Sequence, residues 1–217
     1  MKPLIVVNFK AYSEGLGEKG LELISFLSKY DNVVMSVPAP LISIAEGYSI
    51  KNNACTVKVN VFAQHVDPVE PGAHTGSVTV EEIKMAGAKG SLVNHSEKRI
   101  PFEDIEKAVK KLKENNLTSI VCCQNLDEAV RIKKYNPDYI AFEPPELIGG
   151  DISVTTLPEI IKKIVDAVKP VKVLVGAGVK KRSDIKKSVE LGAVGVLIAS
   201  GVVKAENKEK IRELVNW

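Results

Sequence analysis

The sequence predicts an α/β protein in which eight parallel strands close into a single (β/α)8 barrel over residues 1–217. Eight short apolar runs alternate with eight segments whose apolar residues recur every three or four positions. Strands that alternate with helices form a parallel sheet covered on its faces, and eight such units favour closure. No linker or change of composition divides the chain, so one domain is expected. An open doubly wound sheet is the alternative, because periodicity alone does not demonstrate closure.

The predicted strands are short runs rich in valine, isoleucine and leucine, as suits a sheet that is buried on both faces. They cover residues 4–7, 33–37, 57–63, 91–94, 119–123, 139–142, 171–175 and 194–198. Proline cannot donate to a neighbouring strand, so Pro38 and Pro40 end the second strand and Pro144 and Pro145 end the sixth.

The predicted helices follow the strands in turn. They cover residues 16–30, 41–50, 79–86, 102–112, 127–135, 156–168, 183–192 and 208–215. Thr156 and Glu159 have the spacing of a capping box at the start of the sixth helix, Ser183 is expected to cap the seventh, and Gly192 to end it. Residues 65–76 form a loop rich in proline and glycine, and loops of this length are usually functional or contact a partner.

Composition argues against several classes of protein. The net charge is +3, with 30 basic and 27 acidic residues mixed along the chain, and aromatic residues make up 5%, so a nucleic-acid partner is not expected. Cys55, Cys122 and Cys123 lack metal-ligand or redox spacing, which suggests buried thiols in a reducing compartment. The sequence has no signal peptide and no apolar run of about 18 residues, which predicts a cytoplasmic protein without a membrane partner.

Chemically useful side chains fall just after predicted strands, where barrel enzymes place their active sites. Asn8 and Lys10 follow the first strand two residues apart, so both are expected on the axis side, with Phe9 directed outward. Lys10 can offer a positive charge to an anion, although a lone lysine there is more often simply solvated. Glu143 ends the sixth strand on a rigid proline boundary.

Residues 144–151 after Glu143 suggest a lid that moves as a unit over a fixed carboxylate. Pro144 and Pro145 give this segment a stiff start, and Gly149 and Gly150 give it a permissive end. The alternative is a solvated charge at a strand end, followed by an ordinary connection.

His95 follows the fourth strand and stands just ahead of Ser96 and Glu97. Backbone N–H groups of a turn at that point would disfavour the imidazolium and keep the ring neutral, as a hydrogen-bond donor. His65 and His74 lack this setting and are interpreted as structural.

Small residues follow the last two strands and suggest a phosphate site. They are Gly176 and Gly178 after the seventh strand, and Ala199, Ser200 and Gly201 after the eighth. Backbone N–H groups in such turns bind anions. A phosphate site, a lysine, a neutral imidazole and a lidded carboxylate around one mouth suggest proton transfer beside a carbonyl through an enediolate.

The chain closely resembles the triosephosphate isomerase family in its compact archaeal form, over its whole length. The matching motifs are Asn8-Phe9-Lys10, Asn94-His95-Ser96-Glu97, Ala141-Phe142-Glu143-Pro144 with Ile148-Gly149-Gly150, Gly176-Ala177-Gly178-Val179 and Ala199-Ser200-Gly201. The departures are Asn94 and Ala199-Ser200 in place of glycines, and Pro145-Glu146 in the lid hinge.

The resemblance implies a TIM barrel that interconverts dihydroxyacetone phosphate and D-glyceraldehyde 3-phosphate in glycolysis and gluconeogenesis, without cofactor or metal. It implies Glu143 as the base, His95 as the electrophile and Lys10 as a catalytic cation. The residues that it assigns to substrate binding are Asn8, Phe9, Lys10, Ile148, Gly176, Gly178, Ala199 and Ser200. Glu97 supports Lys10, and whether it acts chemically or only orients the lysine stays open.

The resemblance also implies self-association. The loop around Thr75 and Gly76 is similar to one that family members insert into a neighbouring subunit, and the short helices are similar to those of tetrameric archaeal members. A homo-oligomer, and specifically a homotetramer, is expected.

Two other kinds of protein are compatible with parts of this pattern. Other phosphate-binding barrels, such as phosphoribosyl isomerases and thiamine phosphate synthases, share the glycine turns but do not need the lysine, histidine and glutamate motifs together. A catalytically silent binding protein would keep the phosphate site and the lid, and would bind a phosphate ester without turnover.

Overall fold

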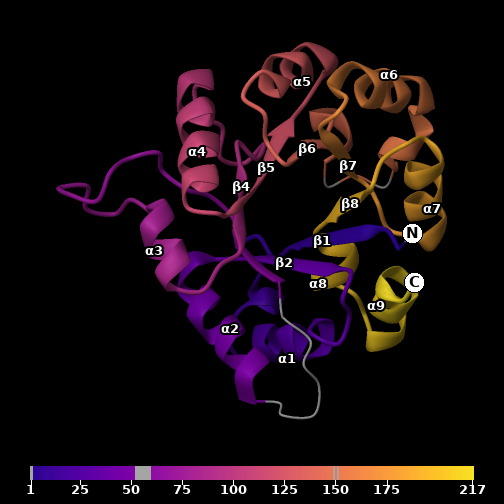
Figure 1. The fold of residues 1–217 in the computed structure, drawn as a ribbon. Coiled ribbons are helices and arrows are strands. Elements are labelled where there is room, and N and C mark those ends of the chain that lie inside the picture. The colour runs from indigo at the N-terminus through magenta and orange to yellow at the C-terminus, as the bar shows by residue number, and fades with distance from the viewer. Residues whose placement is uncertain (1, 52–59, 149, 151) are drawn as a thin grey trace.

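The computed structural model describes residues 2–51, 60–148, 150 and 152–217, and in it the strands form a closed parallel barrel in chain order (Figure 1). The strands are β1 (Leu4–Asn8), β2 (Val33–Val37), β3 (Asn60–Ala63), β4 (Gly90–Val93), β5 (Thr118–Cys123), β6 (Tyr139–Phe142), β7 (Lys172–Gly176) and β8 (Gly195–Ile198). The barrel closes where β8 pairs with β1, with Val196 opposite Ile5. The predicted barrel is therefore confirmed, and the open sheet is excluded.

Helices connect the strands and surround the barrel (Figure 1). They are α1 (Gly17–Leu27), α2 (Ile42–Lys51), α3 (Val80–Met85), α4 (Phe102–Glu114), α5 (Leu126–Lys133), α6 (Pro158–Val168), α7 (Arg182–Glu190), α8 (Ser200–Val203) and α9 (Lys208–Val215). Short 3-10 helices lie in the described connections at Ser13–Gly15, Ala39–Leu41, Pro145–Leu147 and Val154–Thr156. The sequence pattern did not predict α8, because one helical turn is too short to show a period.

Side-chain alternation along the strands builds two hydrophobic layers. In β1, Val6 belongs to a small cluster inside the barrel, whereas Ile5 and Val7 belong to the larger cluster between barrel and helices. The inner cluster is completed by Val34, Phe62, Leu92, Ile120, Cys122, Ala141, Leu174 and Leu197. The barrel interior is therefore a packed core, and the strands end as rigid supports for the loops of the mouth.

Predicted and observed strand ends agree within about one residue where they can be compared. The exception is the third strand: residues 57–59, together with Cys55, lie outside the described part of the chain, which begins again at β3. Gly192 has φ 97°, as expected of a residue that ends a helix in the left-handed conformation.

Two predicted helix caps are wrong. Thr156 ends a 3-10 helix and its hydroxyl donates to the Ser153 carbonyl at 2.9 Å, while α6 begins at Pro158. Ser183 is the second residue of α7, and the Asp184 carboxylate accepts the Lys181 N–H at 3.0 Å instead. In both places, short polar side chains had several backbone partners within reach, and spacing alone did not identify the one used.

The loop of residues 64–78 projects from the barrel between β3 and α3 (Figure 1). Its base is closed by Asp67, whose carboxylate accepts the Val78 N–H at 2.8 Å and contacts His65 Nε2 at 3.0 Å. Farther along the loop, Glu70 lies 2.8 Å from the nearly buried ammonium of Lys111 on α4. His65 therefore contacts Asp67 at the base of this loop, and its structural role stays a prediction. Among the described residues, no helix combines the length and apolar character needed to span a membrane.

Candidate active site

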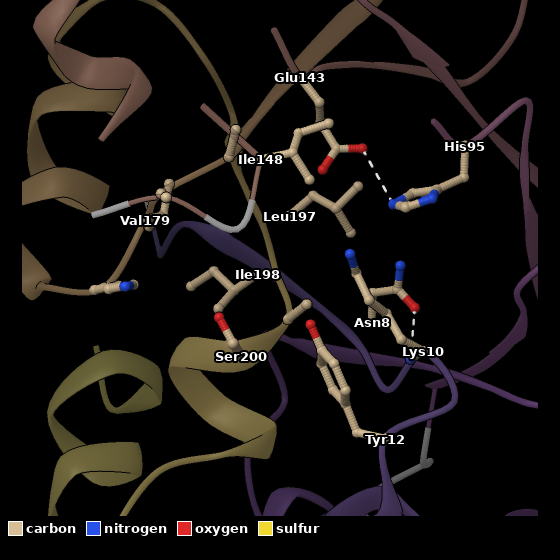
Figure 2. A pocket seen from close by; sticks show the side chains of 15 residues that line it. Asn8, Lys10, Tyr12, His95, Glu143, Ile148, Val179, Leu197, Ile198 and Ser200 are labelled. Atoms are coloured by element: carbon tan, nitrogen blue, oxygen red, sulfur yellow. Dashed lines mark hydrogen bonds and ion pairs between the residues drawn. The ribbon is translucent and has the colours of Figure 1, made fainter. Parts of the chain in front are cut away.

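A pocket opens at the carboxyl ends of the strands and collects residues from five of the predicted motifs (Figure 2). It is lined by Asn8 and Lys10 after β1, His95 after β4, Glu143 after β6, and by residues after β7 and β8. Asn8 and Ser200, which both line the pocket, are 192 positions apart in the sequence, and barrel closure brings them to one mouth.

Glu143 is buried at the end of β6. Its N–H donates to the Cys123 carbonyl at 2.9 Å, which extends the β5–β6 pairing and holds the residue at the strand end. The side chain is 7% exposed, and its Oε2 lies 3.6 Å from His95 Nε2 without a hydrogen-bond donor among the described residues. Burial raises the pKa of the Glu143 carboxyl, and the nearby His95 and Lys10 oppose this rise. A buried carboxylate with an unused oxygen is suited to accept a proton.

Gly176 provides the space that Glu143 occupies. A Cβ atom at Gly176 would lie 2.6 Å from Glu143 Cγ and 2.8 Å from its Oε1, much closer than non-bonded atoms approach. Gly176 is not among the described residues that line the pocket, and its substrate-binding role stays a prediction. The structure instead shows that only glycine at this position leaves room for the side chain of Glu143.

His95 is presented by a left-handed turn at Asn94, whose φ is 61°. Asparagine tolerates this conformation better than most residues, which suits it to this turn. The Asn94 side chain also donates to the Cys122 carbonyl at 3.0 Å and accepts the Ile100 N–H at 3.1 Å. The turn before His95 is thus fixed from both sides.

Hydrogen bonding of the His95 ring defines which nitrogen faces the pocket as a donor. Nδ1 accepts the N–H of Glu97 at 3.2 Å, so a neutral ring carries its proton on Nε2. Nε2 is the atom directed toward Glu143 (Figure 2). The predicted contact between a backbone N–H of this turn and the ring is present, and the role of His95 as a donor stays a prediction.

Lys10 reaches the pocket by a route that differs from the predicted strand alternation. β1 ends at Asn8, and Lys10 adopts a left-handed conformation with φ 49°. The Asn8 side-chain oxygen accepts the Lys10 N–H at 3.0 Å, and Gln64 donates to the same oxygen at 3.1 Å and to the Lys10 carbonyl at 3.0 Å. Both side chains face the pocket as expected, but a hydrogen-bonded turn places the lysine there.

The Lys10 ammonium lies 2.6 Å from Glu97 Oε1. Glu97 therefore contacts the lysine through its carboxylate and His95 through its backbone N–H, which suits the supporting position implied by the resemblance. Phe9 lies between Asn8 and Lys10 in sequence but is fully buried in the outer hydrophobic layer. It anchors the turn from outside the barrel, so we expect it to position its neighbours without touching substrate.

The far end of the pocket is made of small residues and the lid. Gly178 has φ 65°, and a Cβ there would lie 2.0 Å from the carbonyl oxygen of Ile152, so the backbone just after the predicted lid rests directly on this glycine. The same segment is joined to the turn after β7 by the N–H of Val154, which donates to the Ala177 carbonyl at 3.1 Å. Ile148 lines the pocket from the lid, whereas Gly149 and Asp151 lie outside the described residues.

Ala199 and Ser200 line the same end of the pocket from β8, as predicted. The Ala199 carbonyl accepts the N–H groups of Val202 and Val203, so this turn runs directly into α8. The phosphate-binding segments predicted after β7 and β8 therefore converge, although the chain separates them by about twenty residues.

Sequence reasoning missed several residues of the site. Tyr12, Lys180 and Leu197 also line the pocket, and Gln64 holds the turn at Lys10. Cys122 lies inside the barrel beside Glu143, and burial together with that carboxylate raises the pKa of its thiol well above the usual range. Only Tyr12 carried a usable signal, since it stands two positions after Lys10 near the end of a strand.

The fold and the pocket define a (β/α)8 barrel of enzyme type, with a carboxylate, an imidazole and an ammonium at the carboxyl ends of its strands. Residues 3–216 match the family model described as triosephosphate isomerase. The chain therefore belongs to the triosephosphate isomerase family.

Individual relatives agree with this assignment. The chain is 46% identical to the triosephosphate isomerase of Methanothermus fervidus, over 98% of this chain and 96% of the relative. It is 44% identical to that of Methanocaldococcus jannaschii, over 99% of both. The crystal structure of triosephosphate isomerase from Bartonella henselae superposes with a TM-score of 0.69, covering 94% of this chain and 95% of that one, at 21% identity. The last likeness supports the fold.

Proposed function

We propose that the chain interconverts dihydroxyacetone phosphate and D-glyceraldehyde 3-phosphate through an enediolate, as an aldose-ketose isomerase of glycolysis and gluconeogenesis. The observation that carries this proposal is the 3.6 Å contact between a buried carboxylate oxygen of Glu143 and Nε2 of His95 at the mouth of the barrel. A base and a neutral donor at this separation can flank two adjacent carbons of a small sugar.

Glu143 acts as the base. It takes a proton from the carbon beside the substrate carbonyl and returns it to the neighbouring carbon, so the carboxylate is regenerated at the end of each cycle. Burial favours this transfer, because a carboxylate that is poorly solvated is a stronger base than one in water.

His95 and Lys10 stabilise the enediolate. The Nε2–H of His95 donates to the oxygen that becomes negatively charged, and the Lys10 ammonium lies on the β1 side of the same pocket. Glu97 and Asn8 hold these groups before substrate arrives, so little reorganisation accompanies the reaction.

Gly178, Ala199 and Ser200 bind the phosphate end of the substrate, with Ile148 covering it from the lid. Closing the lid excludes water, which strengthens the interactions with the developing charge. Two protons change place in this reaction: Glu143 carries one between the two carbons, and Nε2 of His95 donates one to the carbonyl oxygen and regains one from the neighbouring hydroxyl. The overall oxidation state of the substrate is unchanged, so the proposed reaction uses no redox cofactor, and no step in it is assigned to a metal.

We also propose that the protein is a cytoplasmic homotetramer. The projecting loop of residues 64–78 supports self-association, because its base is tied by Asp67 while its outer part is largely exposed. Light scattering coupled to size-exclusion chromatography measures the assembly. A mass near 23.5 kDa, that of one chain, would contradict self-association.

The activity is tested by a coupled isomerase assay of the purified protein in the presence of a chelator. Turnover of both triose phosphates is expected, whereas binding of a phosphate ester without turnover would favour a silent binding protein. Loss of activity on chelation would favour a metal-dependent barrel enzyme.

The role of Glu143 is tested by Glu143→Asp, with Glu159→Asp as the matched control on the exposed start of α6. The shorter arm moves the base by roughly 1 Å, so kcat is expected to fall by about 100-fold or more while substrate binding is nearly kept. Turnover equal to that of the wild type would contradict the assignment.

A further inference from the structure

Tyr12 is a pocket residue that none of the roles above includes. It lies just after the Lys10 turn and precedes the 3-10 helix Ser13–Gly15. Its side chain is half-buried, and Figure 2 shows its hydroxyl directed into the pocket on the side where Ser200 and Ile198 lie. The hydroxyl therefore faces the end of the pocket formed by the turn after β8.

Two lysines hold the Tyr12 ring in this orientation. The ammonium of Lys204, which follows α8, lies 4.3 Å from the ring centroid, and the ammonium of Lys10 lies 6.0 Å from it. Ammonium groups at these distances attract the face of an aromatic ring. The Tyr12 ring thus connects the turn after β1 with the segment after β8, and its hydroxyl group points into the pocket.

The Tyr12 hydroxyl has no protein hydrogen-bond partner within the described ranges, which leaves its O–H available to a ligand. The two neighbouring ammonium groups make this corner electropositive, so the ligand group that fits it is an anion. The corner also adjoins Ser200, which the proposed function places at the phosphate end of the substrate.

We propose that Tyr12 is a specificity-determining residue that donates a hydrogen bond to a phosphoryl oxygen of the substrate, and that Lys204 is its positioning residue. This inference rests on the proposed function, because it names a further contact to the same substrate. Tyr12 and Ser200 then approach the phosphoryl group from two different connections, those that follow β1 and β8, which favours a compact dianion over an uncharged hydroxymethyl group.

The test is Tyr12→Phe, which removes the hydroxyl and keeps the ring. A hydrogen bond to a charged oxygen is worth enough that KM for triose phosphates should rise about tenfold, as should the inhibition constant of inorganic phosphate, with kcat changed much less. The kcat/KM for D-glyceraldehyde, which lacks the phosphoryl group, should fall less than that for its phosphate ester.

Tyr139→Phe is the matched control. Tyr139 begins β6 at the opposite end of the barrel and also lies near an ammonium, with Lys172 Nζ 5.6 Å from its ring centroid. This variant should leave KM and phosphate inhibition at wild-type values. The inference is overturned if inorganic phosphate inhibits Tyr12→Phe and Tyr139→Phe with the same inhibition constant. It is also overturned if Tyr12→Phe lowers kcat/KM for D-glyceraldehyde and for its phosphate ester by the same factor.

The positioning role of Lys204 is tested by combining Lys204→Met with Tyr12→Phe. Once the hydroxyl is gone, loss of the lysine should raise KM less than it does alone, so the two effects should not multiply. Fully multiplicative effects would contradict the positioning role. Calorimetric titration with inorganic phosphate measures the Tyr12 contact even if the wild type fails to turn over triose phosphates, so failure of this inference and failure of the proposed function are distinguishable.

Discussion

Replacing Gly176 by alanine tests whether the catalytic rate depends on the position of the Glu143 side chain to within about 1 Å. The new Cβ would lie 2.6 Å from Glu143 Cγ and 3.0 Å from its Cδ. Carbon atoms in contact prefer about 3.5–4.0 Å, so the arm of Glu143 must move by roughly 1 Å. A displacement of that size commonly costs about 100-fold in rate, equivalent to about 2.7 kcal/mol of transition-state stabilisation.

The assay for Gly176→Ala is steady-state isomerisation in both directions, with thermal unfolding as a check on folding. We expect kcat to fall by about 100-fold and KM to change less, because the displaced group acts on the reacting carbon and not on the phosphate end. Gly47→Ala is the matched control, since a Cβ at Gly47 on α2 would meet nothing within 4 Å. Wild-type kcat in Gly176→Ala would refute the claim that the close approach of Glu143 to β7 fixes the base.

Three further predictions concern the charges and the backbone of the pocket. Lys10→Met should raise KM and lower kcat, so that kcat/KM falls by a factor of about 100 or more, because an ammonium that faces the anionic substrate is lost. A change in melting temperature without a change in kcat or KM would show that the lysine is structural. Glu143→Gln should be inactive yet more stable than the wild type at neutral pH. Burial raises the pKa of Glu143 in the folded state, so the stability of the wild type falls as pH rises above the ordinary value of 4.5. Melting curves should therefore show the difference in melting temperature between the two proteins shrinking toward acid pH. Ala177→Gly should raise the free energy of unfolding by about 1 kcal/mol in denaturant titrations, because Ala177 has φ 74°, where a Cβ is strained; an unchanged or lower value would contradict this.

Much of the fold could be predicted because it depends on local pattern. Short apolar runs and helical periods identified all the strands and most helices, and eight repeats indicated closure, which the β1–β8 pairing confirms. The wrong caps at Thr156 and Ser183, and the unpredicted α8, lie in connections where several hydrogen-bonding solutions compete within a few residues. That residues 1–217 form one domain stays a prediction.

The candidate site could be predicted in its residue types but not in the way each is held. The positions of Glu143, His95 and Lys10 after strands indicated that they share one mouth, because parallel strands end at one edge of a barrel. The turn that delivers Lys10 depends on Gln64, which is 54 positions away in the chain. Contacts of this kind connect loops that only barrel closure brings together, so no local pattern reports them.

The sequence by itself determined the order of strands and helices, the chemistry available at the strand ends and the family that these motifs resemble. Each of these depends on residues that are close together in the chain. Only the tertiary structure decided that Gly176 makes room for Glu143, that Nδ1 of His95 accepts a backbone N–H, and that the Tyr12 ring lies against Lys204. These depend on distances between atoms of different strands and turns. A change of one ångström in such distances alters reactivity, yet it leaves hydrophobic periodicity untouched.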